Sequence, residues 1–563
     1  MKKKNNGVVV GVLALTAVLV FALVYAGISF ISNLSSDGSM DTDKAAKRLD
    51  RLVKYIEVTE MPLQKDSVQI GTTSLADELP EIDRYPFTVE GYGTVDVEIF
   101  TSPEKGGTGT DGWLNEVAED FNREGFTIDG KTVSVSVRSL ASGLAADYIV
   151  SGKYRPDAFT PSNELWISML EANGVEVNCV EERLVGNVAG IVVSRQTYNL
   201  IEETYGEVSV ATMTKATADN KIAMGYTNPY ASSTGMNFLL SALYEFDHDD
   251  ILSNAAMSGF EGFQKNVPFV AYTTMQMRDA VKSGSFDGLI LEYQTMQNTA
   301  ELGSYEFIPF GARHDNPLYS IGRVDADTEA ALELFAEYCL SDDAQKRAQE
   351  CGFNGYDDYV SQVPAYDGKT LLAAQSFWKE TKDSGRPIAA VFVADISGSM
   401  GGAPIKELKA SLVNSAQYIN SSNSIGLVSY SDEVYINLPI GEFDLNQWSY
   451  FTGAVNSLSA TGGTATYDGI CIGIQMLLEE MELNPDCRPM LFVLSDGYSN
   501  TGCELRDVKP ILEAYNIPVY SICYNDGDFD SLQELSNINE AVCINADSED
   551  VVYQLKSLFN SQM

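Results

Sequence analysis

Oxygen-bearing side chains gather at three places in the last third of the sequence. Asp395, Ser397 and Ser399 alternate in the motif D-I-S-G-S after an apolar run, Thr464 closes G-G-T, and Asp496 lies in L-S-D-G after a second apolar run. Such hard oxygen donors suit Mg²⁺, with Mn²⁺ or Ca²⁺ as alternatives, and suit zinc poorly. Two carboxylates and three hydroxyls leave such an ion electrophilic. We therefore expect a metal site whose open position attracts an acidic side chain of a protein partner.

The elements around these motifs predict a doubly wound α/β sheet. The wholly apolar run 389–394 is typical of a central parallel strand that is covered on both faces. Strand-like runs 424–429, 433–439, 490–494 and 517–524 alternate with helix-compatible stretches such as 405–419 and 467–481. Ligands of such sheets bind at the carboxyl ends of the strands, which is where all three motifs lie.

In this region the sequence resembles the von Willebrand factor type A (VWA) domain and its metal-ion-dependent adhesion site. The family pattern D-x-S-x-S, a threonine and a second aspartate is matched in order by the five residues above, over residues 387–563. The resemblance implies that the serines and the threonine approach the metal directly, and that the aspartates act largely through water. A carboxylate of the ligand would complete the octahedron.

A second group of polar residues belongs to an earlier α/β region, residues 93–381. Hydroxyls and free N–H groups at a helix start can accept anionic or hydroxylated ligands, although Ser233 or Thr234 could equally cap its own helix. The region resembles two-lobed extracellular solute-binding proteins of the periplasmic-binding-protein type II class. That resemblance implies hinge closure on a small ligand, with five candidate residues in the cleft between the lobes: Ser102, Ser142, Ser233, Thr234 and Glu292.

The N-terminus predicts a membrane anchor. Three lysines precede an uncharged apolar run from Gly7 to Ile31, long enough as a helix to cross a bilayer. A cleaved secretory signal is the alternative. The lysines place the N-terminus in the cytoplasm, so residues 1–33 would form a single-pass anchor in the cell membrane with the rest extracellular. We expect residues 34–92 to be a stalk, with one amphipathic helix at 44–56.

Composition narrows the function. The net charge of −42 repels nucleic acid, so no nucleic-acid partner is expected. The sequence has only two histidines, His248 and His314, both in polar stretches and expected at the surface, and no nucleophile elbow, so an enzyme is disfavoured. Among eight cysteines, Cys339 and Cys351 could pair. The favoured function is a membrane-anchored extracellular binding protein with metal-dependent capture of a partner; the alternative is a substrate-binding receptor of a transport or sensing system, with the VWA-like domain as tether.

Overall fold

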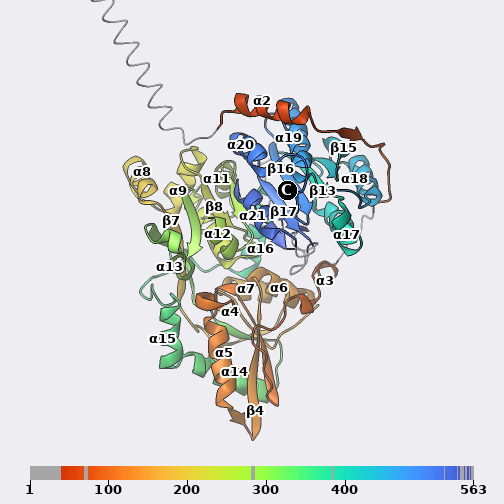
Figure 1. Cartoon of the computed structure of the whole chain (residues 1–563). Coiled ribbons are helices and arrows are strands. Elements are labelled where there is room, and N and C mark those ends of the chain that lie inside the picture. Colours follow the sequence, from red (N-terminus) through yellow and green to blue (C-terminus); the bar gives the residue numbers. More distant parts are fainter. Residues whose placement is uncertain are drawn as a thin grey trace, which may run out of the picture.

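The computed structural model describes residues 40–68, 74–280, 286–382, 386–524, 527–539, 541, 543–545, 551, 555–556 and 558–559. The predicted membrane anchor lies outside these residues. Within the described part of the chain, no helix combines the length and the apolar character that a membrane crossing requires. The described residues form three sheets, which Figure 1 shows in a lower lobe, an upper-left lobe and an upper-right domain.

The first lobe contains a six-stranded sheet of order β3-β4-β2-β5-β12-β6. Its apolar strand residues pack with α5 and α14, where Trp113, Phe121 and Phe335 are fully buried. Its strands are β2 (Val95–Thr101), β3 (Thr127–Ile128), β4 (Lys131–Ser139), β5 (Ala158–Thr160), β6 (Val177–Glu181) and β12 (Leu318–Ile321). Its helices are α4 (Pro103–Gly106), α5 (Trp113–Glu124), α6 (Ser142–Ser151), α7 (Leu165–Ala172), α14 (Ala326–Cys339) and α15 (Asp342–Glu350).

The second lobe contains a five-stranded sheet of order β11-β7-β10-β8-β9. The chain enters it between β6 and β7 and leaves it between β11 and β12, so two short crossovers join the lobes. Its strands are β7 (Asn187–Val193), β8 (Met224–Thr227), β9 (Phe269–Ala271), β10 (Gly288–Glu292) and β11 (Glu306–His314). Its helices are α8 (Arg195–Tyr205), α9 (Val210–Ala218), α10 (Ser233–Phe246), α11 (Asn254–Gln264), α12 (Thr274–Ala280) and α13 (Tyr293–Gln297).

A helix near the end of this region spans both lobes. α16 (Gly368–Thr381) packs against α7 of the first lobe and against α10 and α11 of the second. The Gln375 side-chain amide donates to the Pro229 carbonyl at 2.8 Å, and the Trp378 indole donates to the Tyr226 hydroxyl at 2.7 Å. α16 thus ties the lobes together on one side.

The C-terminal domain contains a seven-stranded sheet of order β1-β15-β14-β13-β16-β17-β18. Alternate residues of its central strand β13 enter two different cores: Phe392 faces one and Val393 the other, as expected for a strand covered on both faces. The strands from the C-terminal region are β13 (Ile388–Asp395), β14 (Ser424–Tyr430), β15 (Val434–Glu442), β16 (Arg488–Ser495), β17 (Val519–Cys523) and β18 (Cys543–Asn545). The helices are α17 (Ala403–Ser415), α18 (Leu445–Ser457), α19 (Thr466–Leu483), α20 (Leu505–Tyr515) and α21 (Phe529–Asn537).

The described part of the expected stalk differs from a free stalk, because its first half packs on the C-terminal domain. α2 (Thr42–Val53) lies over α19 and α20, at the top of Figure 1, and buries Leu49 in that domain's core. Arg48 forms an ion pair with Asp507, with an N–O distance of 3.1 Å. β1 (Val58–Glu60) then adds a parallel edge strand beside β15. The amphipathic face of the predicted helix is thereby covered.

Its second half packs on the first lobe instead. Residues 74–92 contain α3 (Leu75–Glu78) and the 3₁₀ turn η1 (Ile82–Arg84), and Leu79 is buried in the core shared by the two lobes. The Tyr148 hydroxyl donates to the Pro80 carbonyl at 2.9 Å. The N-terminal segment therefore contacts both domains in turn.

Candidate functional site

The sheet brings the two predicted metal-binding aspartates to one edge. β13 and β16 pair in parallel with Ala394 opposite Leu494, so Asp395 and Asp496 both follow the same end of the sheet. Asp395 is fully buried and Asp496 is 1% exposed. Ser397 is buried as well, whereas Ser399 is exposed. The motif thus combines buried carboxylates with a hydroxyl that reaches solvent.

Hydrogen bonds fix the orientation of the Asp395 carboxylate. Its Oδ1 accepts from the Ser397 backbone N–H at 2.8 Å, and its Oδ2 accepts from the Ser495 hydroxyl at 2.7 Å. The Ser397 and Ser399 hydroxyl oxygens lie 3.0 Å apart. Sequence reasoning missed Ser495, whose only signal is its place in L-S-D-G immediately before Asp496.

The threonine loop is attached to the same cluster. The Gly398 N–H donates to the Gly462 carbonyl at 3.0 Å, and the Thr464 N–H donates to the Asn500 side chain at 3.0 Å. Gly462 has φ of +79°, and a Cβ there would lie 2.4 Å from the Asp432 carboxylate, so only glycine suits this turn. Asn500 is a second supporting residue that the sequence pattern does not reveal.

The donor set fits a divalent cation. The Oδ1 atom of Asp496 is buried and has no hydrogen-bond partner within the described residues, an arrangement that costs free energy unless something compensates it. Burial raises the pKa of Asp395, and the charge of Asp496 adds to that rise. Two buried carboxylates that repel each other, next to the hydroxyl residues Ser397 and Ser399, are what a hard cation would stabilise.

The five predicted cleft residues are all buried, and several of them bond across the lobes. The Trp166 indole of the first lobe donates to the Ser233 hydroxyl of the second at 2.8 Å, and Ser233 donates to Ser142 at 3.4 Å. Ser232 caps α10 by accepting from the Gly235 N–H, so neither Ser233 nor Thr234 is the cap. Ser142 and Ser233 line an interlobe cavity of about 10 Å³, room for about one water molecule.

Thr234 and Glu292 lie in a buried hydrogen-bond network. The Glu292 carboxylate accepts from the Thr234 hydroxyl at 3.1 Å and from the Asn187 amide at 2.7 Å. His314 Nδ1 lies 2.8 Å from the same carboxylate. The expectation of a surface His314 is therefore wrong: the residue is fully buried, because it ends strand β11 at the crossover between the lobes rather than lying in a turn.

Ser102 supports a buried lysine instead of lining the cavity. Lys105 is fully buried, and its ammonium reaches the Ser102 hydroxyl at 3.0 Å, the Thr160 carbonyl at 2.8 Å and the Asn316 side chain at 3.0 Å. Burial lowers the pKa of Lys105, while the nearby carboxyl groups of Glu104 and Glu292 partly oppose that shift. Burial and the nearby Glu292 raise the pKa of the adjacent Glu104. The cleft is thus filled by the chain's own charged groups.

Backbone contact closes the cleft. The Gly143 N–H of α6 donates to the Ala231 carbonyl of the second lobe at 3.1 Å. A Cβ at Gly143 would lie 1.9 Å from the Tyr230 carbonyl oxygen, so only glycine permits this approach. Asp111 and Arg278 form an ion pair with an N–O distance of 2.8 Å on another part of the interlobe contact. The described conformation is therefore closed.

Comparisons with known proteins divide the chain in the same way. Residues 106–354 match the family model of the bacterial extracellular solute-binding protein, and residues 390–560 match that of the von Willebrand factor type A domain. An uncharacterized protein of Synechocystis sp., sll0103, is 25% identical over 160 residues, which cover 28% of this chain and 37% of that protein. The chain thus spans little more than a third of the length of this relative.

Two solved structures have partial similarity to this chain. The sulfate-binding protein SubI from Mycobacterium tuberculosis H37Rv is 17% identical, with 51% of this chain and 91% of that chain covered and a TM-score of 0.35. A von Willebrand factor type A protein from Catenulispora acidiphila is 14% identical, with 31% and 42% covered and a TM-score of 0.29. The resemblance seen in the sequence is confirmed: a solute-binding-protein-like region precedes a von Willebrand factor type A region.

Proposed function

We propose that this chain is a membrane-anchored extracellular binding protein that captures an acidic side chain of a protein partner at the Asp395 site, in the presence of a divalent cation. The observation that carries the proposal is the buried Asp496 Oδ1, which has no hydrogen-bond partner within the described residues. Next to it lie the oriented carboxylate of Asp395 and the hydroxyls of Ser397 and Ser399. Mg²⁺ is the favoured ion because all donors are hard oxygens.

The residues of the site would have different roles in binding the cation. Ser397, Ser399 and Thr464 would offer neutral oxygens to the cation, while Asp395 and Asp496 would supply its two compensating charges. When bound, the cation would supply Lewis acidity and an open position for an anionic oxygen from outside. Ser495 would hold Asp395 in place, and the exposed Ser399 marks the side from which a partner could approach.

The alternative function is a substrate-binding receptor for a transport or sensing system. It requires the interlobe cleft to admit a small molecule, whereas the closed cleft leaves about 10 Å³ and is occupied by Lys105, Glu104 and Glu292. The geometry therefore favours a two-lobed region that acts as a fixed support for the C-terminal domain. A small ligand would have to open the lobes and displace their mutual hydrogen bonds.

The test is calorimetric titration of Mg²⁺ into the metal-free full chain, with Asp395→Asn as the variant. The matched control is Asp486→Asn, an exposed aspartate that precedes the same strand β16 at its other end. We expect one ion per chain for wild type and control, and a loss of about tenfold or more in affinity for Asp395→Asn. Equal Mg²⁺ affinity in all three proteins would overturn the metal site.

The expected acidic character of the partner is tested by comparing retention of the protein on immobilised polyglutamate with its retention on immobilised polyglutamine. Because the chain has a net charge of −42, an acidic polymer is repelled by most of its surface, so retention reports a local cation. We expect Mg²⁺-dependent retention on polyglutamate that EDTA reverses and that Asp395→Asn abolishes. Retention that survives EDTA would contradict the proposal.

A further inference from the structure

Two cysteines of the C-terminal domain are in contact with each other. Cys471 belongs to α19 and is fully buried, whereas Cys503 precedes α20 and is half-buried against the same core. Their side chains are hydrogen-bonded, and that bond together with burial raises the pKa of Cys471. Both are free thiols in this structure. The two sulfur atoms thus already face each other.

The backbone around Cys503 is held against the first turns of α19. The Cys503 N–H donates to the Asp468 carboxylate at 2.7 Å, and a Cβ at Gly502 would lie 2.4 Å from the same carboxylate. Asp468 and Cys471 are three residues apart in α19, so their side chains lie on the same face of that helix. Backbone and thiol of Cys503 therefore contact α19 independently, at successive turns.

The loop that ends at Cys503 begins at Asp496 of the candidate metal site. Between them, the Asn500 N–H donates to the Thr464 carbonyl at 2.9 Å, in addition to the bond from the Thr464 N–H to the Asn500 side chain. The loop thus runs beside the start of α19, first at Thr464 and then at Asp468. It connects two of the three motifs of the site, and Cys503 is its last attachment to α19.

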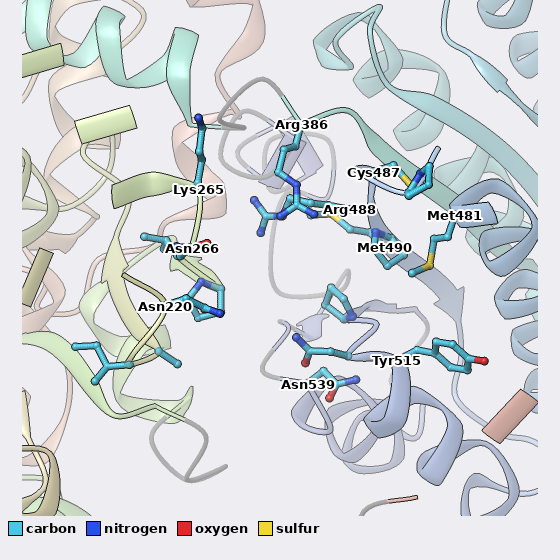
Figure 2. Close-up of a pocket in the computed structure, with 18 of the residues that line it drawn as sticks. Asn220, Lys265, Asn266, Arg386, Met481, Cys487, Arg488, Met490, Tyr515 and Asn539 are labelled. Carbon is cyan, nitrogen blue, oxygen red and sulfur yellow. The ribbon is translucent and has the colours of Figure 1, made fainter. Parts of the chain in front are cut away.

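The two helices next to these cysteines lie side by side. Cys471 and Cys503 lie near the residues at which α19 and α20 begin. Near the other ends of the same helices, Met481 of α19 and Tyr515 of α20 both line a groove beside the second lobe, which Figure 2 shows. A covalent bond between the cysteines would therefore join α19 to the loop at the end that carries the candidate metal site.

We propose that Cys471 and Cys503 form a disulfide that fastens the loop 497–503 to α19 when the protein meets an oxidising environment. The oxidant is a second disulfide, such as glutathione disulfide. The more accessible Cys503 thiolate attacks one sulfur of the oxidant and releases a glutathione thiolate. Cys471 then loses its proton and attacks the Cys503 sulfur, which displaces the second glutathione.

The exchange is balanced. Two protein thiols are oxidised to one disulfide, and one glutathione disulfide is reduced to two glutathione thiols, which take up the two protons. Formation of this bond does not require a cation at Asp395. The proposal can therefore be tested on the metal-free protein, whatever the outcome of the Mg²⁺ titration.

The test is hydrogen exchange of the metal-free full chain, measured after treatment with glutathione disulfide and again after reduction. The probes are the amides of Asn500 and Cys503, whose bonds to Thr464 and Asp468 hold the loop. We expect oxidation to slow their exchange by about tenfold or more, because a disulfide removes open conformations of the loop from which these amides exchange.

Three variants show which cysteines carry the effect. Cys503→Ser and Cys471→Ser should each abolish the difference between the oxidised and the reduced protein. The matched control is Cys487→Ser, another buried cysteine of the same core, which lines the groove in Figure 2 and should keep the difference. Each variant is compared with its own reduced form, so a general loss of stability does not imitate the effect.

Three outcomes would overturn the proposal. One is a peptide map of the oxidised protein in which Cys503 carries only glutathione or is joined to a cysteine other than Cys471. Another is a bond between these two cysteines that leaves the exchange of the loop at its reduced rate, because the bond would then not fasten the loop. The third is an equal effect of oxidation on wild type and on Cys503→Ser.

Discussion

Replacement of Gly143 by alanine should separate the two lobes. The residue lies in the first turn of α6, where intrinsic helix propensity favours alanine over glycine by about 1 kcal/mol. Across the cleft, however, the new Cβ would lie 1.9 Å from the Tyr230 carbonyl oxygen and 2.8 Å from the Ala231 Cα. Both atoms belong to backbone and cannot rotate away. The lobes must therefore move apart by roughly 1 Å to restore an ordinary contact.

The magnitude follows from the hydrogen bonds that this movement breaks. The bond from Gly143 to Ala231 is 3.1 Å long and that from Trp166 to Ser233 is 2.8 Å. Each contributes about 0.5–1.5 kcal/mol, and a buried donor left unpaired costs about 1–3 kcal/mol. The closed state should lose about 2–4 kcal/mol in total, a shift of about 30- to 700-fold toward open forms.

Small-angle scattering and hydrogen exchange measure this effect. Gly143→Ala should increase the radius of gyration and speed amide exchange in α6. The control is Gly262→Ala on α11, also a helical glycine, where a Cβ would meet no atom within 4 Å. That control should gain helix stability without opening. If Gly143→Ala scatters and exchanges like wild type, the lobes do not meet at this contact and the account of the closed cleft fails.

Three further predictions concern buried groups. Burial raises the pKa of Glu104, so its stabilising contribution is complete below the ordinary value of 4.5 and is lost as pH rises through the raised pKa. Glu104→Gln should therefore gain stability over wild type from about pH 5 to about pH 8 in urea titrations, and a pH-independent difference would contradict this. Ser495→Ala should weaken Mg²⁺ binding about tenfold by freeing Asp395, as calorimetry can check. Oxidation by a small-molecule disulfide should join Cys471 to Cys503, whose side chains are hydrogen-bonded. Peptide mapping without reduction checks this pairing, and a different pairing would contradict the prediction.

The sequence predicts how the candidate metal-site aspartates are placed better than it predicts the groups that support them. The apolar runs before Asp395 and Asp496 identify two parallel central strands, and parallel strands present their carboxyl ends at a common edge. Ser495 and Asn500 have no such signal, because a residue that orients another is recognised only once both are placed. Metal binding itself stays a prediction.

The cleft was harder to predict because its partners are distant in the chain. Ser233 donates to Ser142 and accepts from Trp166, and Lys105 reaches Asn316 across 211 residues of sequence. Hydroxyl residues after strands and at helix starts indicated candidates for a ligand cleft, and the structure places them in buried polar positions. They could not indicate that polar groups of one lobe are the hydrogen-bond partners of polar groups of the other lobe. The amphipathic helix at 44–56 likewise indicated an apolar face without its partner, the surface of α19 and α20.

The packing of α2 and β1 on the C-terminal domain determines how the molecule would carry mechanical load. Tension applied between the chain before residue 40 and a partner held at Asp395 would enter through α2 and the edge strand β1. It would then cross the seven-stranded sheet without passing through either lobe. The parallel contact of β1 with β15 would be loaded in shear, so its hydrogen bonds would all be strained at the same time. Under such a pull the two-lobed region would stay outside the force path and keep its closed form.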